Sequence, residues 1–366
     1  MKLTKLGTIG AIVAVGALAL TGCAANEGAK PAPSAAPTEA PASTLAGTIA
    51  GAGASSQGAA QESWIAAFQT ENPDVTISYD PSGSGAGREA FIGGGVSYAG
   101  TDSALSDDEI AGGFEGCVAD SFIQVPAFID PIAVVFNLPG VAQLNLDAPT
   151  IAKIFKGEIT DWSDAAIAAQ NSGWSTSGPI TAVHRSDDSG TTKNFADYLS
   201  KVAPDVWTEK PADPFPYSTG TGAQGTSGVI EAVKSAQGAI GYAAASRAGD
   251  LGIARIKVGD QYVAFSDEAA AAVVAGSPAA DNASATNLAI KLNRKTTNPA
   301  EYPLVLVSYL IACGEYKDAA VAPLVKAYIG YVTSAAGQAA AAETGSAPLS
   351  ADQIAAVQAV VATIVE

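Results

Sequence analysis

One order of segments recurs along this chain: a short apolar strand, a turn rich in glycine and serine, and then an amphipathic helix. Val75, Ile77 and Tyr79 alternate with polar residues as in a half-buried strand, and a Gly/Ser-rich turn at 81–87 follows them. The continuous apolar run at 132–136 suits a strand that is buried on both faces. Strands that alternate with helices predict an α/β fold whose sheets are covered by helices.

The folded body is too long for a single hydrophobic core. It spans about 320 of the 366 residues, from about Leu45 to Glu366, and 48% of the chain is hydrophobic. Single cores stop growing beyond roughly 250–300 residues, and longer chains divide into separate compact parts. We therefore expect two lobes.

The N-terminus has the pattern of an export signal rather than of a folded segment. Lys2 and Lys5 supply a positive region, and the apolar run at 9–20 is too short to span a bilayer. Small residues precede Cys23, which is the pattern that a lipoprotein signal peptidase requires. We expect residues 1–22 to be removed as a lipoprotein signal peptide. The alternative is an ordinary signal peptide with a chance cysteine.

Residues 23–44 form an Ala/Pro-rich stretch with no apolar period. This composition cannot bury a core, so we expect a disordered linker that lifts the folded body off a membrane. Acyl chains such as palmitate on Cys23 would hold the protein on the lipid bilayer, because two or more chains anchor far better than one. The predicted location is the extracytoplasmic face of the cell membrane.

Two cysteines remain in the body once Cys23 is assigned to the lipid anchor. Cys117 and Cys313 are an even remainder, which suggests a disulfide bond in an exported protein. The alternative is a pair of buried free thiols. A bond would close a loop of nearly two hundred residues and stabilise the fold by about 5 kcal/mol in the loop-entropy model, less any strain.

The charge and the histidine content limit the class of function. A formal net charge of −17 argues against a nucleic-acid partner, because phosphate backbones require a basic face. It does not exclude a small anion, which a few local dipoles and one arginine can hold. The chain has one histidine, His184, which is too few for a two-metal phosphatase, and no serine lies in a convincing nucleophile elbow. We expect no enzymatic activity, no cofactor and no metal.

Three short runs place glycine, serine or threonine where a helix is expected to begin. They are 51–57, 82–85 and 184–191, and the last of them adds the guanidinium of Arg185. Backbone N–H groups at a helix N-terminus lack an intrahelical partner, and the helix dipole favours negative charge there. Together the runs predict an anion site drawn from separate parts of the chain.

A fourth run, 100–103, carries Asp102. A carboxylate suits an anion site only if it accepts a proton from the anion. The alternative is a helix cap, because Asp102 precedes the polar stretch 105–108, and the residues taken alone favour this alternative.

In their order and combination, these runs resemble the phosphate-binding proteins of bacterial phosphate ABC importers. The resemblance extends from about residue 47 to the last helices and rests on the runs 51–55, 83–85, 99–106, 185–191 and 238–242. It implies an α/β, periplasmic-binding-protein-like fold of two lobes joined by two crossings, with the ligand cleft between them. Lobe I would comprise 45–124 plus 304–366, and lobe II would comprise 125–303.

The resemblance also implies a role for each matching side chain. Asp102 would accept the proton of hydrogen phosphate, and Arg185 would make a charge-assisted contact steered by Asp187. Hydroxyl and N–H groups would supply the other contacts. Family members often have an aromatic residue where this chain has Ser56, so the lining of the pocket departs from the pattern there. The implied phosphate-binding set is Ser55, Ser56, Ser84, Asp102, Arg185, Ser189, Gly190 and Thr191.

The implied function is high-affinity binding of inorganic phosphate and its delivery to an ABC-type membrane permease. The receptor would be a monomer that closes by hinge motion. At neutral pH inorganic phosphate still carries a proton and sulfate does not, so an ionised Asp102 would accept from the first and repel the second. The alternatives are a receptor for another oxyanion, such as sulfate or molybdate, and a surface protein that keeps the fold.

Overall fold

The computed structural model describes residues 44–119 and 121–366. The predicted signal peptide, the predicted acylation of Cys23 and almost all of the predicted linker lie outside the described residues. Within the described ranges, no helix is long and apolar enough to cross a membrane.

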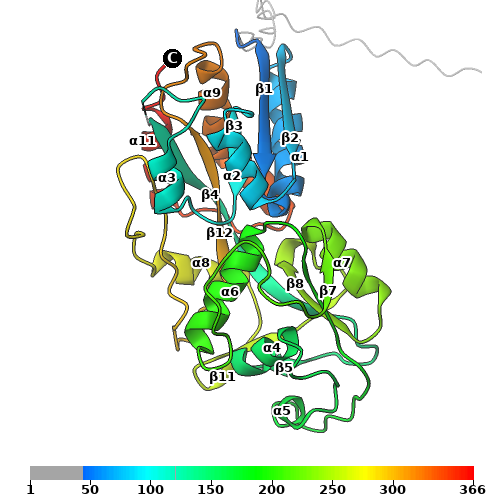
Figure 1. Ribbon diagram of the computed structural model, residues 1–366. Helices are drawn as coiled ribbons and strands as arrows, with labels where there is room; N and C mark the ends of the chain where they lie inside the picture. Colours follow the sequence, from blue (N-terminus) through cyan, green and yellow to red (C-terminus); the bar gives the residue numbers. More distant parts are fainter. Residues whose placement is uncertain (1–43, 120) are drawn as a thin grey trace, which may run out of the picture. The chain divides into compact units, whose positions relative to one another are not determined.

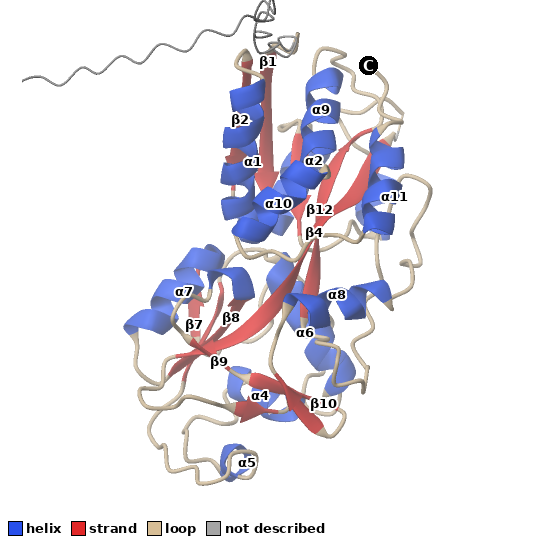
Figure 2. Cartoon of the chain, turned by 180° about the vertical axis from the view of Figure 1, so that it is seen from behind, coloured by secondary structure: helices blue, strands red, loops and turns tan. Residues whose placement is uncertain are grey.

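The first lobe is built on three parallel strands in the order β2-β1-β3. Helices cover these strands, as Figure 1 shows for α1 and α2 and Figure 2 shows for α9 and α10. The elements of this lobe are β1 (Gly47–Gly53), α1 (Gly58–Glu71), β2 (Val75–Asp80), α2 (Ser84–Ile92), β3 (Tyr98–Thr101), α3 (Asp107–Gly112), α9 (Ala322–Val332), α10 (Ala335–Glu343) and α11 (Ala351–Val361).

Two long strands run from the first lobe into the second. They are β4 (Phe122–Phe136) and β12 (Val305–Cys313), which pair antiparallel and are buried along almost their whole length. β4 continues beyond β12 and pairs with a strand of the second lobe from Ile132 onward. The register of the β4–β12 pair shifts between Ser308 and Tyr309. A continuous sheet therefore passes through both lobes, and the two crossing strands hold them together (Figures 1 and 2).

The second lobe continues this sheet and adds a small one. The large sheet ends in the order β8-β6-β7, with β9 also on β4, and the small sheet has the order β11-β10-β5. The elements are β5 (Asn145–Leu146), α4 (Ala148–Phe155), α5 (Ala165–Ala168), β6 (Thr181–Arg185), α6 (Gly190–Val202), β7 (Thr221–Ala223), α7 (Gly225–Ser235), β8 (Ala239–Ala244), β9 (Gly252–Ile253), β10 (Arg255–Val258), β11 (Gln261–Val263) and α8 (Asp267–Ala275).

Local sequence explains where several of these helices begin. The Asp147 side chain accepts a hydrogen bond from the Thr150 N–H at 2.9 Å, and Pro149 occupies the first turn of α4. Ser106 begins α3 with a capping box that Glu109 completes. The alternative reading of Asp102 as the cap of this helix is therefore wrong, because Ser106 performs that function.

Separate hydrophobic clusters fill the two lobes. The first core contains Trp64, Tyr98 and Tyr328, and the second contains Trp162 and Trp207, all of them almost fully buried. A third, smaller cluster lies between α7 and β8. Division into two lobes thus follows from the amount of apolar surface that each part can bury.

Helix α8 contacts both large cores. Its residues Ala270, Val273 and Val274 belong to the first core, whereas Ala269 belongs to the second. The Leu288 N–H also donates to the Gln124 carbonyl at 2.8 Å. A stretch of chain that we assigned to lobe II therefore packs partly on lobe I, and the exact lobe boundaries stay a prediction.

Cys117 and Cys313 are joined by a disulfide bond, with 5.2 Å between their Cα atoms and a sequence separation of 196 residues. Both cysteines are buried in the first core. The bond fastens the loop after α3 to the end of β12, so both of its ends lie in one lobe.

Candidate anion site

Asp102 lies at the centre of the predicted site, directly after β3. Its side chain is buried and surrounded by hydroxyl groups. The Ser56 hydroxyl lies 2.8 and 2.7 Å from the two carboxylate oxygens, and the Ser308 hydroxyl donates to Oδ1 at 2.6 Å. The Thr191 hydroxyl donates to Oδ2 at 3.2 Å. These donors come from the 3₁₀ turn after β1, from β12 and from α6, so three distant segments converge on one carboxylate.

The number of protons around Asp102 defines what it can still accept. An ionised carboxylate has about four lone-pair positions and no proton to donate. Ser56, Ser308 and Thr191 each have one hydroxyl proton, so they fill three of the positions at most. At least one acceptor position remains for a further donor.

Burial raises the pKa of Asp102 above the ordinary value of an aspartate. Hydrogen bonds from Ser308 and Ser56, the positive charge of Arg185 and the hydrogen bond from Thr191 act in the opposite direction. The hydroxyl donors therefore stabilise the ionised form that acts as an acceptor.

The turn after β1 brings Ser56 to this carboxylate. Gly53 has a φ of +142°, and a Cβ atom at this position would lie 1.9 Å from the Gly100 carbonyl oxygen, so a larger residue cannot occupy it. The short 3₁₀ helix at Ser55–Gln57 follows and begins the turn into α1. Close approach of β1 to β3 thus requires glycine and places Ser56 beside Asp102.

Ser84 and Gly190 bring the two lobes into contact at the site. The Ser84 hydroxyl, at the first residue of α2, accepts a hydrogen bond from the Asp102 N–H at 3.1 Å. A Cβ atom on Gly190 would lie 2.6 Å from the Ser84 hydroxyl and 2.8 Å from the Asp102 Cβ. Only glycine allows α6 to begin so close to Asp102.

The start of α6 supplies further polar groups. Ser189 is the N-cap, and its hydroxyl accepts from the Thr192 N–H at 3.2 Å. At the N-terminus of a helix, the free backbone N–H groups and the positive end of the helix dipole stabilise a nearby negative charge. The Thr191 hydroxyl points to Asp102 from the same turn.

Arg185 ends β6 and is held in place by Asp187. The guanidinium Nε donates to Asp187 Oδ1 at 2.7 Å, and a second guanidinium nitrogen pairs with Oδ2. Partial burial acts to raise the pKa of Asp187, but the hydrogen bonds and the charge of Arg185 outweigh it, so the pKa is lowered. Asp187 Oδ1 also accepts from the Gly225 N–H at 3.0 Å. A buried, oriented cation thus lies close enough to act on the charge of Asp102.

Ser55 faces a different neighbour from Ser56. Its hydroxyl lies 3.1 Å from the Thr226 hydroxyl and accepts from the Thr226 N–H at 3.1 Å. Thr226 is in the first turn of α7, so Ser55 joins the first lobe to another helix start of the second lobe. The structure thus gathers the predicted residues around one place, and their predicted contacts with phosphate stay a prediction.

The sequence reasoning missed Ser308 and Thr226. Ser308 is a single polar residue in an otherwise apolar run at 304–307 and 309–312, which is a signal that could have identified it. Its hydroxyl also accepts from Gln57 Nε2 at 2.8 Å, and Gln57 in turn accepts from Gln61 at 2.9 Å. A buried chain of amides thus orients the hydroxyl that donates to Asp102.

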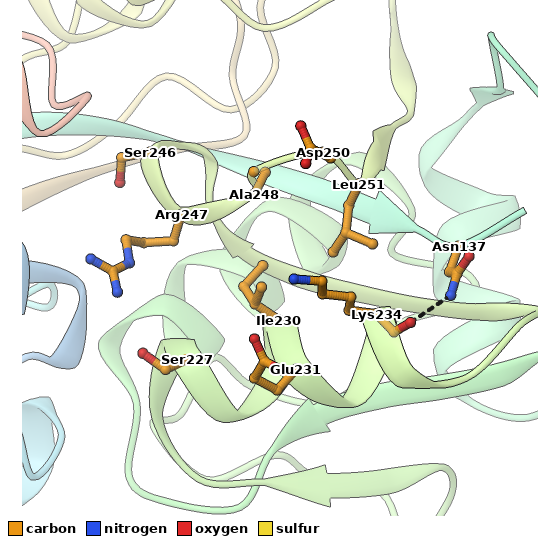
Figure 3. A pocket seen from close by; sticks show the side chains of 11 residues that line it. Asn137, Ser227, Ile230, Glu231, Lys234, Ser246, Arg247, Ala248, Asp250 and Leu251 are labelled. Atoms are coloured by element: carbon orange, nitrogen blue, oxygen red, sulfur yellow. Dashed lines mark hydrogen bonds between the residues drawn. The ribbon is translucent and has the colours of Figure 1, made fainter. Parts of the chain in front are cut away.

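A cavity of about 630 Å³ lies elsewhere on the second lobe (Figure 3). Glu231 and Lys234 of α7 form one side of it, and Arg247 and Leu251 form another. None of the predicted phosphate-binding residues lines this cavity. Among the residues that the structure describes, no group of three or more His, Cys, Asp or Glu could hold a metal ion.

Comparison with known proteins places the chain in a family. Residues 38–336 match the model of the PBP superfamily domain. The chain is 33% identical over 356 residues to phosphate-binding protein PstS 3 of Mycobacterium leprae, covering 95% of this chain and 96% of that protein. PstS 3 of Mycobacterium tuberculosis is 34% identical over the same coverage. This chain belongs to the PstS family of phosphate-binding proteins.

Solved structures agree on the fold of this PstS family member. A high-affinity periplasmic phosphate-binding protein, PfluDING, solved with bound phosphate, matches with a TM-score of 0.66 at 22% identity over 86% of this chain and 93% of that chain. A phosphate ABC transporter substrate-binding protein from Clostridium perfringens matches with a TM-score of 0.59 at 19% identity over 83% and 100% of the two chains. The prediction of an α/β, two-lobe binding-protein fold is confirmed.

Proposed function

We propose that this chain binds inorganic phosphate outside the cytoplasm and delivers it to an ABC-type membrane permease. The observation that carries the proposal is the acceptor position that remains on the buried carboxylate of Asp102. A position of this kind favours an anion that brings its own proton. Hydrogen phosphate has such a proton at neutral pH, whereas sulfate and molybdate do not.

The surrounding groups supply what a bound phosphate needs besides this acceptor. Arg185 offers a buried guanidinium for a charge-assisted contact, and its pairing with Asp187 fixes its orientation. The hydroxyls of Ser55, Ser84 and Ser189 and the free N–H groups at Gly190 and Thr191 complete the proposed donor set. Phosphate oxygens at the start of α6 would also face the positive end of a helix dipole.

Selectivity would follow from charge and proton count. Sulfate in this site would place an oxygen lone pair against the ionised Asp102, and like charges in contact cost several kcal/mol. A tenfold preference needs only about 1.4 kcal/mol. One carboxylate therefore suffices for strong rejection of sulfate.

The receptor would be a monomer held on the extracytoplasmic face of the membrane by acylated Cys23, after removal of residues 1–22. Residues 23–44 would be the linker. Lobes of 45–124 plus 304–366 and of 125–303 would close on phosphate and dock on the permease. Relatives that are named for binding phosphate, and not for catalysis, support a receptor rather than an enzyme.

Calorimetric titration tests this function. The purified protein is first stripped of bound anion by partial unfolding and refolding, and phosphate and sulfate are then titrated separately at neutral pH. Tight one-to-one binding of phosphate with no sulfate signal is expected. Sulfate binding alone would show a receptor for another oxyanion, and silence from both anions in a folded protein would refute the proposal.

A further inference from the structure

Arg88 of α2 is buried in the first lobe and makes two ion pairs with very different partners. Its side chain is 5% exposed. Nε donates to Glu109 Oε1 at 2.7 Å, and Nη2 donates to Asp213 Oδ2, also at 2.7 Å. Glu109 is in α3 of the same lobe. Asp213 lies between α6 and β7 of the second lobe.

Asp213 is fixed to the second lobe by its surroundings. Phe215, two residues later, packs against Phe155 and Trp207 of the second core. The Asp213 carbonyl accepts a hydrogen bond from the Ser189 N–H at 3.1 Å. Asp213 is therefore attached directly to the N-cap of α6, which belongs to the candidate anion site.

A second contact ties the same carboxylate to the residue that follows Asp102. The Ser103 hydroxyl, one residue after Asp102, donates to Asp213 Oδ1 at 3.0 Å. Arg88 also donates to the Ser103 hydroxyl at 2.8 Å and to Thr101 at 3.1 Å. Both oxygens of Asp213 are thus held by the first lobe, beside the residue on which the site is centred.

The charged form of Arg88 is favoured. Burial acts to lower the pKa of Arg88, but the negative charges of Asp213 and Glu109 outweigh it, and the pKa is raised. Opening the cleft would separate Arg88 and Ser103 from Asp213, whereas the Arg88–Glu109 pair would move as one unit. Of the two ion pairs, only Arg88–Asp213 depends on closure of the lobes.

We propose that the Arg88–Asp213 ion pair is a latch between the lobes that positions the site in its closed form and slows the release of phosphate. This inference rests on the proposed function, because phosphate is the ligand that the latch retains. Neither residue belongs to the set proposed to contact phosphate, so the latch acts through closure and leaves the choice of anion to Asp102. Truncating one partner of a buried charge pair between two surfaces mainly raises the dissociation rate.

Asp213→Asn tests the latch, and Glu109→Gln is its matched control. Each substitution removes one negative charge that lies 2.7 Å from the same guanidinium. The Asp213 backbone contact to Ser189 survives, and in each variant Arg88 keeps one carboxylate partner. Release is measured with radiolabelled phosphate chased by an excess of unlabelled phosphate, and unfolding by urea is measured on the same samples.

Asp213→Asn is expected to speed phosphate release about 10-fold to 100-fold, from the usual strength of hydrogen bonds to charged groups. The ratio of phosphate to sulfate affinity should stay within about twofold, because Asp102 is unchanged. Glu109→Gln should lower resistance to urea while leaving the release rate within about twofold.

Equal release rates for Asp213→Asn and the unsubstituted protein would overturn the latch. So would a Glu109→Gln variant that releases phosphate as fast as Asp213→Asn, because the effect would then reflect the charge balance of Arg88 and not closure. Absence of phosphate binding by the unsubstituted protein is a separate result, which would overturn the proposed function and the latch together.

Discussion

Substitution of Asp102 by asparagine should weaken the preference of the site for phosphate over sulfate. The asparagine side chain has the same shape but replaces one carboxylate oxygen by an NH₂ group. The remaining oxygen can still accept from Ser56 and Ser308, which lie 2.8 and 2.6 Å from Oδ1. On the other side, two N–H donors replace the acceptor to which Thr191 donates at 3.2 Å. The free acceptor position therefore becomes a donor.

The size of the effect follows from the two interactions that change. Phosphate loses a hydrogen bond to a charged acceptor, which is worth about 1.5–3 kcal/mol, so its affinity should fall about 10-fold to 150-fold. Sulfate gains a donor and no longer meets a like charge, whose cost is several kcal/mol, so its affinity should rise at least tenfold. The ratio of phosphate to sulfate affinity should therefore fall at least about 100-fold.

Calorimetric titration of both anions measures this ratio, and Asp187→Asn is the control. Asp187 pairs with Arg185, which would contact either anion, so this substitution should weaken phosphate and sulfate to similar degrees. Urea unfolding of both variants confirms that the comparison is made on folded proteins. A ratio in Asp102→Asn that stays within a factor of about two of the unsubstituted protein would refute the reasoning about the acceptor position.

Three further predictions follow from the buried groups. Ser308→Ala removes a donor to the ionised Asp102, so the pKa of that carboxyl should rise further. As the pH is lowered across a series, phosphate binding by the variant should therefore begin to decline at a higher pH than binding by the unsubstituted protein. An unmoved pH profile would contradict the role given to Ser308. Asp130 is fully buried in β4, and its Oδ1 has no hydrogen-bond partner among the described residues. Burial raises its pKa well above the ordinary value, so its favourable contribution to stability is present at low pH and is lost as the pH rises through the folded-state pKa. Asp130→Asn should therefore gain stability relative to the unsubstituted protein as the pH rises above about 4, the ordinary pKa of an aspartate. Urea titrations across a pH series measure this gain, and a stability difference independent of pH would count against it. Replacing Cys117 and Cys313 together by alanine should lower the free energy of unfolding by about 2–5 kcal/mol. A reductant should lower the urea midpoint of the unsubstituted protein and leave the midpoint of the variant unchanged.

Much of the local structure could be predicted from the sequence because its causes lie within a few residues. Asp147 caps α4 through an N–H only three residues away, and Ser189 caps α6 through Thr192. The order of strand, glycine-rich turn and helix sufficed for the α/β class, since periodicity and turn chemistry are local properties. The candidate set around Asp102 came from the resemblance of these short motifs, in their order and combination, to those of the phosphate-binding proteins.

The tertiary structure alone decided which side chains meet Asp102 and how the lobes are fastened. Ser308 lies 206 residues from Asp102, and it reaches the carboxylate because β12 lies between β3 and β4, with a register shift at that residue. Thr226 meets Ser55 across 171 residues, and Asp213 meets Arg88 across 125 residues. Such contacts depend on strand pairing and on the closure of one lobe against the other, and no pattern within a short window of sequence specifies either of them.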